Sequence, residues 1–303
     1  MGMITDSSLF EFEAITVDAE GKLLKKECLA TQHYLEPLKD EVFLDMVSIP
    51  PGQFLMGCPD TEEGYHSSQG PQHRVSIANF WMSRYPITQA QWAVVASLPK
   101  IAESLDPECA NFRGAERPVE QVSWYEAMEF CARLSQLTNK QYDLPREAEW
   151  EYACRGNTQT PFHFGETLTT DLANYSGVDW EYQAKICSKG AYGAGPLGCD
   201  RRETTPVNHF AVGNTFGLSD LHGNIREWCA DPWHRNYTNA PTDGSIWQIN
   251  GDDSKRVIRG GSWNVGPQKC RSARRDRFDP NASLYDIGFR VVCRSYGIVK
   301  ILD

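Results

Sequence analysis

The stretch Arg256–Cys293 reads RVIRGGSWNVGPQKCRSARRDRFDPNASLYDIGFRVVC, with two ordered ends around a middle that follows no period. The first end has an apolar strand pattern that runs into the Gly260–Gly261 turn. The other end, Ile287–Val292, is a strand-like run. Between them, polar, charged and aromatic residues alternate without helical or strand spacing. The ends therefore predict scaffold strands, and the middle needs another explanation.

The composition is that of a globular protein and excludes several function classes. The 303 residues are 41% hydrophobic and 23% charged, with a formal net charge of −10 and a pI near 5.3. This negative charge argues against a general binder of nucleic acid or anionic membranes, because phosphate surfaces would repel it. No apolar run is long enough to cross a bilayer, and the N-terminus lacks the pattern of a secretory signal. We therefore expect a cytoplasmic protein, and, without a heptad pattern, a monomer.

The ten cysteines are scattered, and no two of them form a C-x-x-C pair. Zinc ribbons and thioredoxin-type redox motifs are therefore not supported. In a chain without a secretory signal, the cysteines are expected to be reduced thiols that act as small apolar side chains.

Local signals predict a few regular elements. The alternating run Phe10–Glu13 predicts an edge strand. Thr88 is an expected helix N-cap, and the pair Ser123 and Glu126 has capping-box spacing ahead of a second helix. A third, shorter helix is expected to end at Gly156. Beyond it the chain is rich in Gly, Pro, Asn, Asp and aromatic residues, which predicts one large domain with much irregular loop.

Six phrases stand out along the chain, in the order MVSIPPGQFLMGC, PQHRVSIANFWMSRYPITQAQW, RPVEQVSWYEAMEFC, LPREAEWEYACRG, TPVNHFAVGNTFGLSDLHGNIREW and RVIRGGSW…IGFRVVC. In this order they resemble the formylglycine-generating-enzyme family. This resemblance implies an α+β, C-type-lectin-like fold of that family's type, with few regular elements. It divides the chain into an N-terminal leader or edge-strand segment (1–42), the domain itself (43–296) and a tail (297–303), with a variable region at 256–293.

The resemblance does not carry over the family's chemistry. Its enzymes oxidise a sulfatase cysteine with two copper-binding cysteines, whose positions here are Val265 and Cys270. One thiolate cannot form a two-sulfur Cu(I) site, and the H-x-x-x-H-x-E iron site of a related branch is absent from the sequence. We therefore expect no enzymatic activity and no catalytic cofactor. The alternative is a divergent cysteine oxidase that uses Cys270, which otherwise is a buried apolar filler.

The resemblance also implies structural calcium. Family members hold Ca²⁺ around the phrase GNxxEW, which would use the Glu227 carboxylate with carbonyls of His222, Gly223 and Ile225. Alternatively, Glu227 forms only a salt bridge or caps a loop.

A second family calcium site has a looser match in this chain. It would use Asn174 and the Tyr175 carbonyl, with a carboxylate near Asp200. The segment 178–200 is longer than usual for the family, which loosens the alignment at this site.

The closest resemblance is to the variable target proteins of diversity-generating retroelements. In these proteins, codons of the form AAY are diversified within a C-terminal region that reads like Arg256–Cys293. The resemblance implies a fixed frame, which includes Arg259, Arg271, Arg275 and Arg290, with varied residues between its members. The varied positions would be Asn264, Val265, Gly266, Arg274, Asp276, Arg277, Phe278, Asp279, Asn281, Ala282, Ser283, Leu284, Tyr285 and Asp286.

Codon chemistry agrees with this set. Randomising the first two bases of AAY never yields Lys, Gln, Glu, Met or Trp, and none of the fourteen residues is one of these. AAY codons cannot produce Gln268 or Lys269, so these two residues are either fixed or derived from other adenine-bearing codons.

A position that varies freely must lie outward. Overpacking or burying a charge in the core costs roughly 1–5 kcal/mol, whereas surface changes usually stay within about 0.5 kcal/mol. The mixture of residue types suits a binding surface for an unknown ligand, most simply a protein. The expected apolar anchors are Phe278, Leu284 and Tyr285, and the expected charged contacts are Arg274, Arg277, Asp276, Asp279 and Asp286. An accessory interaction module without diversification is the remaining alternative.

Overall fold

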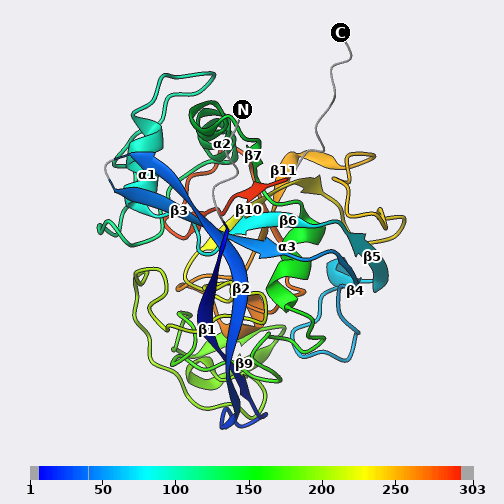
Figure 1. Ribbon diagram of the computed structural model, residues 1–303. Coiled ribbons are helices and arrows are strands. Elements are labelled where there is room, and N and C mark those ends of the chain that lie inside the picture. Colours follow the sequence, from blue (N-terminus) through cyan, green and yellow to red (C-terminus); the bar gives the residue numbers. More distant parts are fainter. Residues whose placement is uncertain (1–6, 40, 295–303) are drawn as a thin grey trace.

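The computed structural model describes residues 7–39 and 41–294 of the chain. Three α-helices and three short 3-10 helices stand among fourteen strands and long irregular loops, as the resemblance predicts (Figure 1). The helices are α1 (Gln89–Ala96), α2 (Trp124–Thr138), α3 (Glu147–Arg155), η1 (Ser67–Gln69), η2 (Ser188–Gly190) and η3 (Pro267–Lys269). The strands are β1 (Ser8–Val17), β2 (Leu23–Lys39), β3 (Val42–Ile49), β4 (Gly52–Met56), β5 (His73–Ile77), β6 (Phe80–Ser83), β7 (Tyr142–Asp143), β8 (Trp180–Tyr182), β9 (Lys185–Cys187), β10 (Arg226–Trp233), β11 (Asp252–Arg259), β12 (Asp276–Phe278), β13 (Ile287–Gly288) and β14 (Val292–Cys293).

The predicted helix ends are confirmed. The Thr88 hydroxyl accepts a hydrogen bond from the Gln91 amide at the start of α1. At the start of α2, the Ser123 hydroxyl accepts from the Glu126 amide while the Glu126 carboxylate accepts from the Ser123 amide. Gly156 ends α3 with a φ of 49°, a left-handed conformation that glycine adopts readily.

Two main sheets organise the molecule. The first has the order β1-β2-β3-β6-β14-β7, so β1 is the edge strand that the alternating run predicts. Its two N-terminal strands form the long ribbon drawn in dark blue in Figure 1. The second sheet has the order β12-β11-β10-β13. Helix α3 contacts β4 and β5 as well as β10 and β11, so it joins the second sheet to the rest of the fold.

The stretch Arg256–Cys293 contributes to both sheets. Its first end is the last part of β11, as predicted. Its other end is not one strand, because β13 pairs with β10 in the second sheet while β14 pairs with β6 and β7 in the first. The segment between them crosses from one sheet to the other, and Phe289 packs edge-on against Trp92 and Phe130 there. The middle is also more regular than expected, since it contains η3 and β12.

Two further expectations can be compared with the described residues. All nine cysteines whose side chains are described are free thiols. Within residues 7–39 and 41–294, no helix is long and apolar enough to cross a bilayer. The predicted tail, 297–303, lies outside the described residues.

Candidate functional site

Four arginines of the stretch Arg256–Cys293 are almost completely buried, and we call them the framing arginines. Their exposed fractions are 1% or less, although a buried charge is costly unless it is paired and hydrogen-bonded. Each one meets a carboxylate from a different part of the chain. They are Arg259, Arg271, Arg275 and Arg290.

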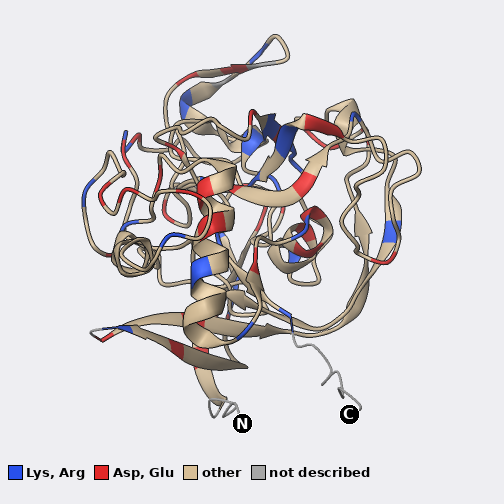
Figure 2. Ribbon diagram, turned by 90° about the horizontal axis from the view of Figure 1, so that it is seen from above, with Lys and Arg blue, Asp and Glu red and all other residues tan. Residues whose placement is uncertain are grey.

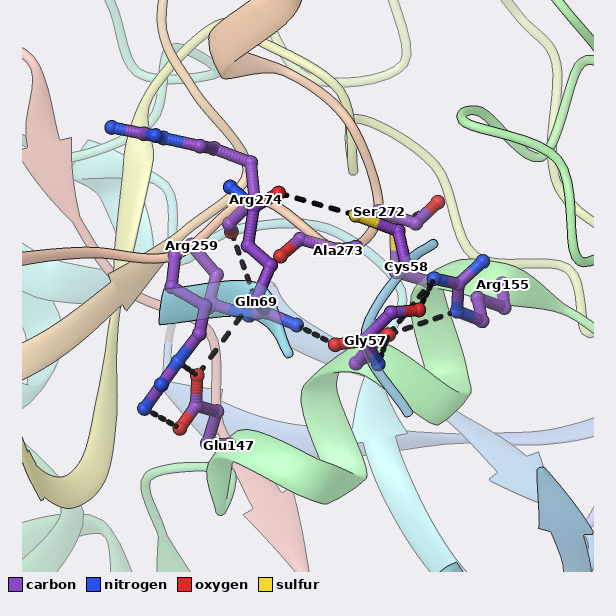
Figure 3. A network of polar contacts seen from close by, with 12 residues as sticks. Gly57, Cys58, Gln69, Glu147, Arg155, Arg259, Ser272, Ala273 and Arg274 are labelled. Carbon is purple, nitrogen blue, oxygen red and sulfur yellow. Dashed lines mark hydrogen bonds and ion pairs between the residues drawn. The ribbon is translucent and has the colours of Figure 1, made fainter. Parts of the chain in front are cut away.

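Two framing arginines share the carboxylates of helix α3. Arg259 pairs with Glu151, and its Nη1 donates to the carbonyls of Ala273 and, at 2.8 Å, Arg274 (Figure 3). Arg275 forms a bidentate pair with Glu147 at 2.6 and 2.8 Å. These bonds attach the backbone at residues 273–275 to the buried face of helix α3.

The other two framing arginines secure its flanks. Arg271 pairs with Glu62 and donates to the Gln69 side chain at 3.0 Å. Arg290 forms a bidentate pair with Glu227 at 2.7 and 2.8 Å. The frame that the resemblance implies is therefore held by ion pairs between segments far apart in the sequence.

The fourteen predicted variable residues differ in exposure. Six are exposed: Asn264, Arg277, Asp279, Asn281, Ser283 and Tyr285. Five are partly buried: Val265, Asp276, Phe278, Ala282 and Leu284. The last three are buried: Gly266, Arg274 and Asp286.

The expectation of an outward position is therefore wrong for three residues. Asp286 is 2% exposed because it accepts two hydrogen bonds of 2.6 Å from Arg226 and one of 2.8 Å from the Ser262 hydroxyl. Gly266 packs against the Trp180 ring, which a Cβ at this position would approach to 2.6 Å. Arg274 is 8% exposed.

The predicted apolar anchors also divide. Phe278 and Leu284 are partly buried and pack against the hydrophobic cluster that helices α1 and α2 form with strands of both main sheets. Tyr285 is 45% exposed and lies beside Trp263, with ring centroids 5.6 Å apart. Phe112 contacts the same tryptophan edge-on at 5.3 Å. Phe112 lies far outside the stretch, so only the three-dimensional structure reveals it as a neighbour of the predicted surface.

Arg226 is a second residue that the sequence did not single out. Besides its pair with Asp286, its guanidinium lies 4.9 Å from the ring centroid of Phe278. It precedes Glu227 in β10, so this fixed strand supports two of the predicted variable residues.

The carboxylate of the first predicted calcium site does not fit the ion. Both oxygens of Glu227 accept hydrogen bonds from Arg290, and one also accepts from the Trp150 indole at 2.7 Å. A cation here would face a guanidinium group instead of a free carboxylate. Beside Glu227, the His222 ring contacts the Cys270 carbonyl at 2.7 Å and the Gly223 amide donates to the Gly260 carbonyl. These bonds do not involve the carbonyls of His222 and Gly223 that are predicted as calcium ligands. Glu227 therefore forms the salt bridge of the alternative interpretation, and Ile225 is a buried core residue beside it.

The residues of the second predicted site are also engaged. Asn174 and Tyr175 are buried, and the Asn174 amide donates to the Asn224 side chain at 3.1 Å. The Asp200 carboxylate accepts from the Ser176 hydroxyl and from Arg202. Among the buried side-chain oxygens of this predicted site, the neutral Oδ1 of Asn174 has no hydrogen-bond partner within the described residues. There too, no group of three or more His, Cys, Asp or Glu side chains is placed to hold a metal ion.

Cys270 packs against the Gly260–Gly261 turn. It is fully buried, and burial raises the pKa of its thiol to about 12. Both glycines have positive φ, and a Cβ on Gly261 would lie 2.5 Å from the Cys270 sulfur. Val265, the other predicted family position, is partly buried, and its carbonyl accepts from the Ser176 amide.

Known proteins share this architecture. Formylglycine-generating enzyme of Bos taurus is 28% identical over 292 residues, which cover 81% of this chain and 73% of that one. The solved structure of PvdO from Pseudomonas aeruginosa is 31% identical in sequence and has a TM-score of 0.67. The match covers 86% of this chain and 99% of that one. Treponema denticola variable protein 1 has the same fold, with 24% identity, a TM-score of 0.66 and coverages of 87% and 99%. Residues 32–295 match the family described as "Sulfatase-modifying factor enzyme 1-like domain", and the chain belongs to that family.

Proposed function

We propose that this protein is a non-catalytic binding protein whose residues between the framing arginines form a variable ligand-binding surface, diversified by a retroelement. The alternation of burial along the stretch Arg256–Cys293 carries the proposal. Eleven of the fourteen predicted variable residues are exposed or partly exposed, while the framing arginines are buried.

The physical basis is the different tolerance of the two groups. Replacing an exposed side chain usually changes stability by less than about 0.5 kcal/mol, whereas removing one partner of a buried ion pair costs about 3–5 kcal/mol. A scaffold that confines its costly interactions to fixed positions can accept many residues at the others. The likeness to the Treponema variable protein supports the suitability of the scaffold, because the fold is shared.

The surroundings of Cys270 support the non-catalytic part of the proposal. A reactive cysteine is partly exposed and has a lowered pKa, but this thiol is buried with a raised pKa. Val265 supplies no ligating side-chain atom at the other family position. Titration of the wild type and of Cys270→Ser with Cu(I), followed by a thiol-oxidation assay, distinguishes the two functions. We expect no activity in either protein; copper binding and oxidation that disappear in Cys270→Ser would instead identify an oxidase.

The ligand that we propose is another protein, bound by a monomer in the cytoplasm. Charged residues of both signs are interspersed over the fold (Figure 2), and the outward set includes Arg277, Asp279 and the aromatic Tyr285. Such mixtures of charge and aromatic area suit protein interfaces better than a uniform polyanion. Sedimentation of the purified chain tests the monomeric state.

The neighbouring DNA tests diversification directly. We expect a reverse-transcriptase gene and a near-copy of the segment that encodes residues 256–293, which differs from it only at adenines. The codons for the exposed Arg277, Asp279, Ser283 and Tyr285 should be among those that differ, whereas Asn264 and Asn281 correspond to unchanged AAY codons. A copy that differs equally at other bases, or the absence of any copy, would contradict diversification and favour an accessory module with a constant surface.

A further inference from the structure

A large open hollow lies beside β12 at the edge of the second sheet. Its volume is about 820 Å³. The loop 234–251 forms most of it, and this loop is attached to β5 by the hydrogen bond from the Ser76 amide to the Thr242 carbonyl. Of the fourteen predicted variable residues, Arg277 lines this hollow.

Three aromatic side chains that are held by their neighbours line the hollow. His234 stacks on Trp247, with ring centroids 3.6 Å apart and planes 3° from parallel. The His234 ring also contacts the Ile249 carbonyl at 3.0 Å. Trp233 is only 6% exposed, and Arg277 lies over its ring at 4.7 Å from the centroid. None of these three side chains belongs to the predicted variable set.

The charged groups at the rim favour an anion. Arg235 and Arg277 are both exposed cations of the lining. The one carboxylate of the lining belongs to Asp252, and it accepts hydrogen bonds from the amide and the hydroxyl of Ser254. Neutral donors and acceptors surround these charges, on the side chains of Asn236, Thr238, Asn239 and Asn250.

We propose that this hollow is a subsite for a carboxylate group of the ligand, and that Arg277 is the residue that determines its charge preference. This inference rests on the proposed function, because it treats position 277 as varied. A guanidinium presents two parallel N–H donors that match a carboxylate, and contact with the Trp233 ring limits the orientations it can adopt. The constant loop would shape the pocket while one residue of the stretch sets its charge.

Codon chemistry then predicts how the preference changes. An AAY-derived codon yields Arg at position 277 but equally Asn or Asp. Asn would leave a neutral pocket with the same walls. Asp would present a carboxylate at the same place and favour a cationic group.

The test uses three blocked pentapeptides, acetyl-Gly-Gly-Xaa-Gly-Gly-amide, with Glu, Gln or Lys as Xaa. Binding is followed by the indole N–H signals of Trp233 and Trp247 in NMR titrations, which detect weak complexes and are assigned with the Trp233→Phe and Trp247→Phe variants. In the wild type, we expect the Glu peptide to bind about tenfold more tightly than the Gln peptide, because its hydrogen bonds are charge-assisted. Arg277→Asn should remove this difference, and Arg277→Asp should reverse it in favour of Lys.

Arg202→Asp is the matched control, because Arg202 is exposed and the change in net charge is the same. If it reduces Glu-peptide binding as much as Arg277→Asp does, the effect is one of net charge and the subsite is wrong. Equal binding of all three peptides to the wild type, or preference for Lys, also overturns it. If the peptides give such a negative result but a template repeat varies codon 277, the subsite is wrong and the variable surface is still supported. A Glu preference without a repeat would keep the subsite and remove the diversification.

Discussion

Arg275 and Arg277 are two positions apart in the chain but belong to different regions of the molecule. Arg275 is 1% exposed and has both of its carboxylate bonds with Glu147, whereas Arg277 is exposed over the Trp233 ring. The buried arginines pair with carboxylates from segments far away in the sequence, whereas the exposed residues mainly contact residues near them in the sequence. One stretch of sequence thus combines residues that fix the scaffold with exposed residues outside its buried ion pairs.

The largest effect should separate these two arginines. Arg275→Met leaves the buried Glu147 without its main partner, so we expect the free energy of unfolding to fall by about 3–5 kcal/mol. Arg277→Met removes a surface contact and should cost less than about 1 kcal/mol. Urea denaturation monitored by tryptophan fluorescence measures both. Equal losses in the two variants would mean that the stretch has no division into frame and surface.

A second pair of variants tests the correction at Asp286. Asp286→Asn removes the charge that pairs with Arg226 inside the structure, and should cost about 1.5–3 kcal/mol. Asp279→Asn is the matched control, because Asp279 is exposed and accepts hydrogen bonds from Asn281. A loss for Asp286→Asn as small as that for the control would return Asp286 to the outward residues.

Two buried carboxylates, those of Glu151 and Glu120, differ in pKa according to whether they form an ion pair with an arginine. For Glu151, burial acts to raise the pKa, but Arg155 and Arg259 outweigh it and hold the pKa below its usual value. Glu120 is also buried, but its Oε1 accepts from the Phe112 amide while its Oε2 has no hydrogen-bond partner in the described residues. Burial therefore raises the pKa of Glu120 to about 7. The backbone amides of Asn111 and Phe112, and Arg113, oppose this shift, and Asp286 adds to it.

A pH titration should reveal the unpaired carboxylate. Because the pKa of Glu120 is higher in the folded protein than in the unfolded chain, folding favours its protonated form. The contribution of protonated Glu120 to the free energy of unfolding is fully present below about pH 4.5 and is lost as the pH rises to about 7. The unfolding free energy of the wild type, relative to Glu120→Gln, should fall by about 1–3 kcal/mol over this range. A difference that is flat or rises with pH would contradict the raised pKa.

The sequence predicted the features that depend on neighbours in the chain. Thr88 and Ser123 cap their helices because their partners lie three residues away. It could not predict the burial of Asp286, whose partner Arg226 is 60 positions distant. It also missed the split of Ile287–Val292, because strand patterns do not show which sheet receives each end. The pairing of Glu227 with Arg290 could not be predicted for the same reason, since the two residues lie 63 positions apart.

The smallest effect should occur at Ser283, and it defines the tolerance of the outward region. Ser283 is exposed in the loop between Pro280 and the buried Asp286. Replacement by Tyr or Arg, both reachable from an AAY codon, should change the free energy of unfolding by less than about 0.5 kcal/mol. Ala273→Tyr serves as the contrast, because Ala273 is 1% exposed and overpacking there should cost about 1–3 kcal/mol. If Ser283→Tyr is as costly as Ala273→Tyr, this loop cannot accept the replacements that diversification requires, although the framing arginines would still be structural.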